Sequence, residues 1–300
     1  MSYITAAQRP SYDVQKEMMF KLRHAYPFLS CGFVGSSLCS RRLLSFSLGS
    51  GKKPVILAAG FHAQEWLTVL ALYRLTELLC RSRADGEAVC GINAAGAIAD
   101  REVIIVPCVN PDGVEIALNG AGAAFEYEQT VLKASGGDLS NWNANARGVD
   151  INHNFDAGWA ILRRKEIAAG ITGPAPRRYG GFAPESEPET QALADLCMRV
   201  NPRRVVALHS QGEEIFWQYS DKTPEGARET AQLFAAASGY TLVQNSGLAS
   251  HGGFKDWFIE CFEKPGFTFE IGKGKNPLPI EDFEAIFSKA LKMLVLSIIL

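Results

Sequence analysis

The stretch PVILAAGFHAQEWLTVLALYRLTELL, residues 54–79, joins an apolar run to a helical pattern through a short polar junction. Residues 54–59 are apolar without interruption, which is typical of a strand buried on both faces of a sheet. From Glu65 to Leu79 the large apolar side chains recur at helical spacing, which predicts an α-helix. A buried strand that leads directly into a helix is the repeating unit of α/β folds.

The same alternation continues along the chain. Apolar runs predict further strands at 43–48, 103–108, 204–208 and 266–271, and helical patterns cover 186–200, 224–238 and 280–296. Strands that alternate with helices predict an α/β sheet covered on both faces. We expect one domain over residues 1–300, in which 1–42 form an N-terminal helix and lead-in.

Two stretches, 119–147 and 170–188, are predicted to be irregular. The first is rich in Gly, Ala and Asn, and the second holds four prolines together with Arg177, Arg178 and Tyr179. Long loops in a compact domain commonly carry function, so we expect both stretches to form walls of a functional site.

Composition excludes several classes of protein. The 300 residues include 30 basic and 32 acidic side chains, and a net charge of -2 argues against binding nucleic acid mainly through phosphate contacts. No apolar run approaches the roughly 20 residues of a membrane span, and residues 1–10 show no export signal. Seven cysteines without a C-x-x-C pair favour reduced thiols. We therefore expect a cytoplasmic protein with no nucleic-acid or membrane partner, and leave its oligomeric state open.

The junction contains His62-Ala63-Gln64-Glu65, at the carboxyl end of a predicted strand, where open α/β sheets bind ligands. Residues three apart share a helix face, so His62 and Glu65 can face one metal ion; a capped helix start with a chance histidine is the alternative. His209 also follows a predicted strand. Two histidines and one glutamate would give zinc three protein ligands and an open fourth position, which is the catalytic pattern.

Glu270 is the third polar residue at a predicted strand end. A solvated charge at the edge of a strand is one interpretation. A general base that takes a proton from water beside the metal is the other. Because three such groups stand at three strand ends, we favour the second interpretation.

Five ordered segments resemble the zinc carboxypeptidase family of metallopeptidases: GFHAQEW at 60–66, NPDG at 110–113, GVDINHNF at 148–155, LHS at 208–210 and FTFE at 267–270. The resemblance implies a single α/β domain with a mixed, largely eight-stranded sheet flanked by helices. It also implies one zinc ion per chain, bound by His62, Glu65 and His209, with Glu270 as the general base. Asp150 matches a carboxylate that accepts the other ring N–H of His62; an ordinary loop hydrogen bond is the alternative. In either case NPDG is expected to form a turn.

The sequence departs from the digestive members of that family. Their Asn-Arg pair, which clamps the substrate's terminal carboxylate, reads Asn152-His153 here, and histidine cannot form arginine's two-pronged contact. This disfavours a general trimmer of protein C-termini. The oxyanion-stabilising arginine also lacks a direct match, so we expect either Asn143 or Arg147 to take that role. Leu248 stands near the position of the family's mobile tyrosine.

These departures, with segments at 152–159, 209–213, 252–258 and 272–279, resemble the bacterial γ-D-glutamyl-meso-diaminopimelate peptidases, which cleave cell-wall stem peptides. The resemblance implies a small muropeptide as substrate. A diaminopimelate pocket needs both signs of charge. The candidate substrate-binding residues are Asn152, His153, Glu213, His251, Asp256 and Lys273, with Arg147, Glu214 and Lys275 as further charges. A carboxypeptidase or amidohydrolase for another small substrate, or an inactive muropeptide-binding protein, are the alternatives.

Overall fold

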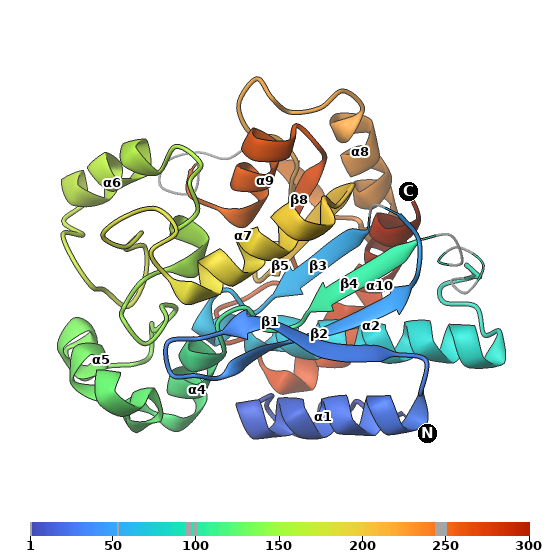
Figure 1. Cartoon of the computed structure of the whole chain (residues 1–300), viewed down its shortest axis with the longest axis horizontal. Helices are drawn as coiled ribbons and strands as arrows, with labels where there is room; N and C mark the ends of the chain where they lie inside the picture. Colours follow the sequence, from blue (N-terminus) through green and yellow to red (C-terminus); the bar gives the residue numbers. More distant parts are fainter. Residues whose placement is uncertain (1, 53, 94–95, 97, 99–100, 244–250) are drawn as a thin grey trace.

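The computed structural model describes residues 2–52, 54–93, 96, 98, 101–243 and 251–300. In this part of the chain eight strands form one sheet in the order β1-β2-β4-β3-β5-β8-β6-β7, with helices on both faces (Figure 1). The strands are β1 Ser30–Ser36, β2 Arg42–Gly49, β3 Val55–Ala59, β4 Glu102–Val106, β5 Arg204–His209, β6 Glu214–Phe216, β7 Thr241–Val243 and β8 Gly266–Glu270. The α-helices are α1 Tyr12–Ala25, α2 Trp66–Asp85, α4 Pro111–Asn119, α5 Glu128–Ser135, α6 Trp159–Ala168, α7 Pro188–Val200, α8 Ala227–Ser238, α9 Phe254–Phe262 and α10 Phe283–Ile299. The predicted α/β fold with a mixed, largely eight-stranded sheet is confirmed.

The four central strands run parallel to one another. β3 pairs in parallel with β4 and with β5, and β5 pairs in parallel with β8, whereas β2 and β6 join this group in antiparallel. The register places His209, the last residue of β5, opposite Glu270, the last residue of β8. The carboxyl ends of β3, β5 and β8 therefore meet at one edge of the sheet.

Alternation along the buried strands divides the core into two layers. In β3, Val55, Leu57 and Ala59 belong to the apolar cluster that contains residues of α2 and α10. Ile56 and Ala58 belong to a second cluster, which contains residues of α7 and α9. In Figure 1, α7 crosses in front of the sheet and α10 lies behind it. Because side chains alternate between the faces of a strand, a continuous apolar run packs against both helical layers.

The predicted strands and helices are present, with boundaries that differ by a few residues. The prediction for 119–147 is partly wrong, because 3₁₀-helix η2 (Ala121–Tyr127) and α5 occupy much of it. α5 has only eight residues and buries one of them, Val131, and so short a helix gives a weak periodic signal. The NPDG segment is also more than a turn: the Asn110 side chain caps α4 by accepting from the Gly113 N–H at 2.9 Å. The 170–188 stretch is irregular up to Pro188, where α7 begins.

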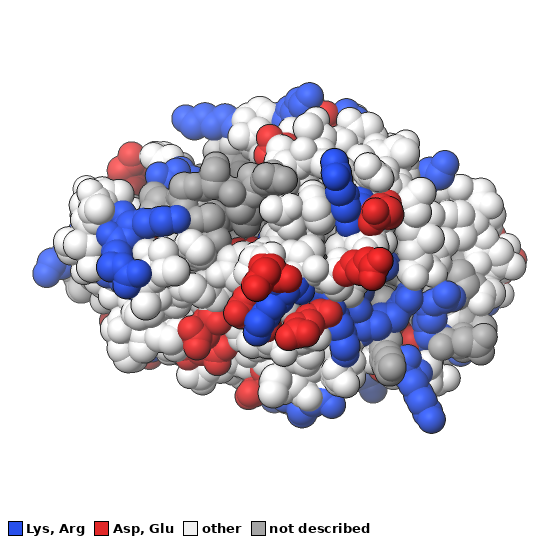
Figure 2. All heavy atoms as spheres, turned by 90° about the horizontal axis from the view of Figure 1, so that it is seen from above, with Lys and Arg blue, Asp and Glu red and all other residues white. Residues whose placement is uncertain are grey.

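Three further observations concern the surface charge, the length of the helices and the position of Leu248. On the face shown in Figure 2, acidic and basic side chains are interspersed, in line with the net charge of -2. Over the described residues, each helix is too short or too polar to cross a membrane. Leu248, which we place near the family's tyrosine position, lies outside the described residues.

Candidate active site

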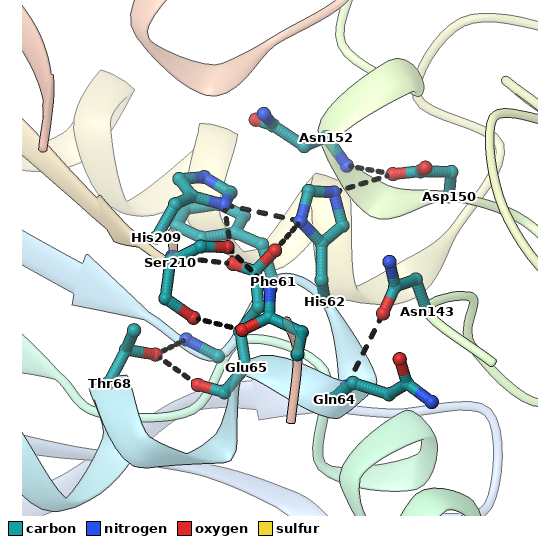
Figure 3. Close-up of polar contacts among 12 residues, drawn as sticks. Phe61, His62, Gln64, Glu65, Thr68, Asn143, Asp150, Asn152, His209 and Ser210 are labelled. Carbon is teal, nitrogen blue, oxygen red and sulfur yellow. Dashed lines mark hydrogen bonds and ion pairs between the residues drawn. The ribbon is translucent and has the colours of Figure 1, made fainter. Parts of the chain in front are cut away.

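Three predicted metal ligands converge where β3 and β5 end (Figure 3). After β3 the chain turns at Gly60, whose φ of +62° and close contact with Val69 leave no room for a Cβ. His62 then precedes the 3₁₀-helix η1 (Ala63–Glu65), so its Nδ1 lies 2.8 Å from Oε1 of Glu65. His209 places its Nδ1 3.0 Å from Oε2 of the same carboxylate.

The arrangement of these donor atoms fits a tetrahedral zinc ion. Potential ligand atoms of His62, Glu65 and His209 all lie within 4.8 Å of one another. The two Nδ1 atoms are 3.3 Å apart, and Zn–N bonds of 2.0–2.1 Å place two ligands of a tetrahedron about 3.3 Å apart. Two histidines and one carboxylate leave a fourth position open, as catalytic zinc sites do.

Asp150 orients His62, one of the predicted metal ligands. Its Oδ1 accepts a hydrogen bond from Nε2 of His62 at 3.1 Å, which directs the lone pair of Nδ1 toward Glu65 and His209. Asp150 belongs to the segment before η3 (Ile151–His153), and its side chain also accepts from the Asn152 N–H at 3.2 Å. The structure therefore places Asp150 as the predicted partner of His62.

Charges in this cluster support one another. Burial raises the pKa of Glu65, but His62 and His209 outweigh burial and lower the pKa to about 2. Burial also lowers the pKa of His62, but the carboxylates of Glu65 and Asp150 outweigh it and raise the pKa well above its usual value. For His209 burial prevails and lowers the pKa. An ionised carboxylate between two imidazoles is a ready binding site for a divalent cation.

Glu270 faces the same cleft from the neighbouring strand. It ends β8, lies opposite His209 in the register, and lines both pockets described below. Burial, followed by the negative charge of Glu65, raises the pKa of Glu270 well above its usual value. A carboxylate of raised pKa beside the metal ligands is suited to taking a proton from water and returning it.

The structure distinguishes the two candidate oxyanion donors. Asn143 lines the cleft, and its Oδ1 accepts from the Gln64 N–H at 3.4 Å. Figure 3 shows its amide nitrogen turned away from Gln64. Arg147 instead forms an ion pair with the fully buried Glu187 at 3.7 Å. Asn143 is therefore the candidate that the structure brings to the site.

Two adjoining pockets flank the metal ligands. The inner pocket, about 140 Å³, is lined by residues that include Asn152, His153, His251, Lys255 and Asp256. The outer pocket, about 490 Å³, is lined by residues that include Asn143, Asp150, Arg177, Arg178 and Glu214. His62, His153 and Glu270 line both pockets, so the predicted metal and base residues lie between them.

The predicted substrate-binding residues divide into two groups. Asn152, His153, His251 and Asp256 line the inner pocket. Glu213 and Lys273 lie outside both pockets and pair with each other at 3.1 Å, and Glu213 also pairs with Lys289 at 2.6 Å. Their charges therefore neutralise one another at the surface.

Sequence reasoning did not single out Lys255, a charged residue of the inner pocket. Lys255 was hidden inside the Gly252–Phe258 segment, although a lysine within an apolar helical pattern is a usable signal. Its side chain is 3% exposed and forms an ion pair with Asp256, which is equally buried. Arg177 and Arg178 stand in the 170–188 stretch that was expected to form a wall, and they line the outer pocket.

A His-Glu-His cluster at the carboxyl ends of central strands, with a glutamate of raised pKa beside it, defines a zinc-dependent hydrolase. The comparison with known families agrees. The zinc carboxypeptidase family model matches residues 16–292, and the chain belongs to this family. It is a zinc metallopeptidase.

Sequence relatives extend over most of the chain. It is 34% identical over 290 residues to gamma-D-glutamyl-L-diamino acid endopeptidase 1 of Lysinibacillus sphaericus, covering 96% of this chain and 72% of the relative. It is also 34% identical over 288 residues to the uncharacterized protein YqgT of Bacillus subtilis, covering 94% of this chain and 75% of the relative.

Solved structures confirm the fold. Thrombin activatable fibrinolysis inhibitor superposes with a TM-score of 0.76 at 19% identity, covering 99% of this chain and 76% of that one. Murein-tripeptide amidase MpaA of Escherichia coli O157 superposes with a TM-score of 0.55 at 24% identity, covering 88% of this chain and 91% of that one.

Proposed function

We propose that the protein hydrolyses the γ-D-glutamyl-meso-diaminopimelate amide bond of peptidoglycan stem peptides. The observation that carries this proposal is the buried Lys255–Asp256 ion pair on the inner pocket beside the metal ligands. The relative from Lysinibacillus sphaericus, named for a γ-D-glutamyl-L-diamino acid bond, supports the same substrate class.

The inner pocket offers both signs of charge. Lys255 donates from Nζ to the Gln218 carbonyl oxygen at 2.7 Å and to Oδ1 of Asp256. Burial raises the pKa of Asp256, although Lys255 opposes this shift. The far end of diaminopimelate carries one ammonium and one carboxylate. Such an end group can pair with Asp256 and Lys255 respectively, whereas an apolar or singly charged side chain would leave one charge unmatched.

His153 replaces the family's carboxylate-clamping arginine and is itself held in place. Its Nδ1 lies 2.9 Å from Oε1 of Glu166, which is fully buried. The other oxygen of Glu166 accepts from the Gly180 N–H at 3.1 Å. Only Nε2 of His153 remains for substrate, so the contact is single and positioned, not the two-pronged grip of an arginine.

The chemistry follows from the residues between the pockets. Zinc held by His62, Glu65 and His209 would polarise the scissile carbonyl and acidify water. Glu270 takes a proton from the attacking water and returns it to the leaving amine. Asn143 donates its amide N–H to the oxygen that gains negative charge.

The test is product analysis by mass spectrometry. Zinc-loaded protein is incubated with L-Ala-γ-D-Glu-meso-diaminopimelate and, separately, with α-linked peptides that have free C-termini. We expect release of diaminopimelate from the first and no trimming of the second. Chelation of zinc should stop the release, and added zinc should restore it. Trimming of the α-linked peptides alone would contradict the proposal and indicate an ordinary carboxypeptidase.

A second substrate pair tests the charged pocket. L-Lysine has the side chain of diaminopimelate without the terminal carboxylate, so wild type should prefer the diaminopimelate tripeptide over L-Ala-γ-D-Glu-L-Lys. Lys255→Met should remove that preference, because it removes the cation that would bind the carboxylate. Lys21→Met, at an exposed position on α1, is the matched control. An unchanged preference in Lys255→Met would exclude Lys255 as the carboxylate partner.

A further inference from the structure

Two arginines at the mouth of the outer pocket carry charges that no acidic side chain neutralises. Arg177 and Arg178 are both exposed and line this pocket. Over the described residues, neither guanidinium forms an ion pair, whereas nearby Arg147 and Arg163 are paired with Glu187 and Glu166. The outer pocket therefore has two cations available for an anionic ligand.

The residues that build the metal site also hold the backbone around these arginines. The Arg178 N–H donates to Oδ2 of Asp150 at 2.8 Å, while Oδ1 of the same side chain accepts from His62. The Pro176 carbonyl accepts from the N–H of Asn143 at 2.7 Å. Arg178 has a φ of +65°, which a residue with a side chain adopts only where its surroundings impose it. The arginine-bearing segment is therefore fixed relative to the metal ligands.

A γ-linked glutamyl residue differs from an ordinary residue by one charged group. Its side-chain carboxyl forms the amide, so its main-chain carboxylate stays free, a few bonds from the carbonyl that is attacked. An α-linked residue without an acidic side chain has no carboxylate at this place. Arginine binds carboxylates through two parallel N–H···O bonds, which makes it the suitable partner.

The charges of the two pockets indicate which half of such a substrate each pocket would bind. The inner pocket presents Lys255 and Asp256, both signs of charge, to the diaminopimelate half. The charge on the glutamyl half next to the scissile bond is its free carboxylate. The outer pocket presents the guanidinium groups of Arg177 and Arg178 to it. The acidic residues of that pocket are Glu65 and Asp150, which lie against His209 and His62, and Glu214 on β6 and Glu270 on β8.

We propose that Arg177 and Arg178 form a subsite for the free α-carboxylate of a γ-linked glutamyl residue and so favour such substrates over peptides that lack this carboxylate. This inference rests on the proposed function and adds the group that recognises the acyl half of the substrate. The subsite is a binding site; the residues that move protons are unchanged.

The experiment compares two tripeptides that differ only at this carboxylate. L-Ala-γ-D-Glu-meso-diaminopimelate carries it, and L-Ala-γ-D-isoglutaminyl-meso-diaminopimelate has a neutral carboxamide in its place. We measure kcat/KM for both with the zinc-loaded full chain. A charged hydrogen bond at an exposed site should give wild type about a 5- to 20-fold preference for the acid.

Four variants locate the effect. Arg177→Gln, Arg178→Gln and the double variant should lower the acid-to-amide ratio to about 2 or less, mainly by slowing hydrolysis of the acid. Arg177→Lys and Arg178→Lys in one chain should restore part of the ratio, because the charge remains. Arg199→Gln, at an exposed position on α7, is the control and should keep the wild-type ratio.

Each other outcome overturns the inference. If wild type cleaves both peptides equally, or the double variant keeps the preference, the arginines do not bind this carboxylate. If the variants slow both peptides by the same factor, the arginines support the fold or the reaction instead. Cleavage of neither peptide would overturn the proposed function, and calorimetric binding to the zinc-loaded protein would then decide. Tighter binding of the acid that is lost in the double variant supports the subsite, and equal or absent binding refutes it.

Discussion

The metal centre and the substrate wall are built in different ways. The proposed metal centre is the cluster of His62, Glu65 and His209, which stand within six residues of the ends of β3 and β5. The substrate wall, defined here as His153, Arg177, Arg178, Lys255 and Asp256, comes from loops and from α9, and contacts between distant segments position it. Changes at the metal centre should therefore impair the reaction with every substrate, whereas changes in the wall should alter which substrate is chosen.

The largest effect that would sharpen this contrast is expected for Glu270→Gln. The amide keeps the shape of the side chain but cannot accept the proton, so turnover should fall about 1,000-fold. Zinc content, measured by elemental mass spectrometry, should remain at one ion per chain because Glu270 is not a ligand. Glu214→Gln changes the carboxylate that lies opposite Glu270 in the pairing of β6 with β8, and it should lower turnover far less. Near-normal turnover in Glu270→Gln would exclude it as the base.

A smaller effect should separate Asn143 from Arg147. Asn143→Ala removes an amide donor from the outer pocket and should lower kcat about 100-fold while zinc content stays constant. Arg147→Gln should leave kcat nearly unchanged, because the guanidinium is directed to Glu187. Both variants are assayed by steady-state release of diaminopimelate. The reverse pattern would make Arg147 the donor.

Asp150 joins the two regions, so its replacement should break the contrast. Asp150 accepts from Nε2 of His62 through one oxygen and from the Arg178 N–H through the other. Asn has a single acceptor oxygen for these donors. Asp150→Asn should weaken zinc binding by about 10- to 100-fold and should also reduce the preference for the γ-linked acid over its amide.

Metal-buffer titration measures the zinc affinity of Asp150→Asn, and the two tripeptides measure its substrate preference after saturation with zinc. Asp156→Asn, at an exposed position in the following turn, is the control and should change neither quantity. Loss of zinc affinity with an intact preference would show that the wall is positioned independently of Asp150.

The same difference between the metal centre and the substrate wall explains which features could be predicted from the sequence. The convergence of His62, Glu65, His209 and Glu270 could be predicted because each polar side chain interrupts an apolar strand-and-helix pattern near a strand end. The central strands were predictable for the same reason. The wall has no such periodicity: the pairing of His153 with Glu166, or of Arg178 with Asp150, depends on which loops meet in space. Glu213 and Lys273 show the converse, since their charges suggested a pocket and instead satisfy each other.

The smallest effect concerns a buried carboxylate beneath the wall. Glu189, in the first turn of α7, is fully buried and accepts from the Leu38 N–H at 3.2 Å and from Nδ2 of Asn145 at 3.4 Å. Asn145 belongs to the loop that carries Asn143. Burial, followed by the charge of Asp112, raises the pKa of Glu189 from 4.5 to about 8.

The folded protein therefore keeps a proton on Glu189 where the unfolded chain has released it, so this group makes the free energy of unfolding fall as pH rises from about 4.5 to about 8. Glu189→Gln, a neutral side chain of the same shape, should remove that dependence. Its stability relative to wild type should increase between pH 5 and pH 9, by an amount on the order of a few kcal/mol. Urea unfolding of the zinc-loaded proteins at both pH values measures the change, and Glu281→Gln at an exposed position should track wild type. If the free energies of unfolding of Glu189→Gln and wild type differ by the same amount at both pH values, Glu189 is already ionised in the folded protein at pH 5. The loop bearing Asn143 would then contact a charged side chain through Asn145.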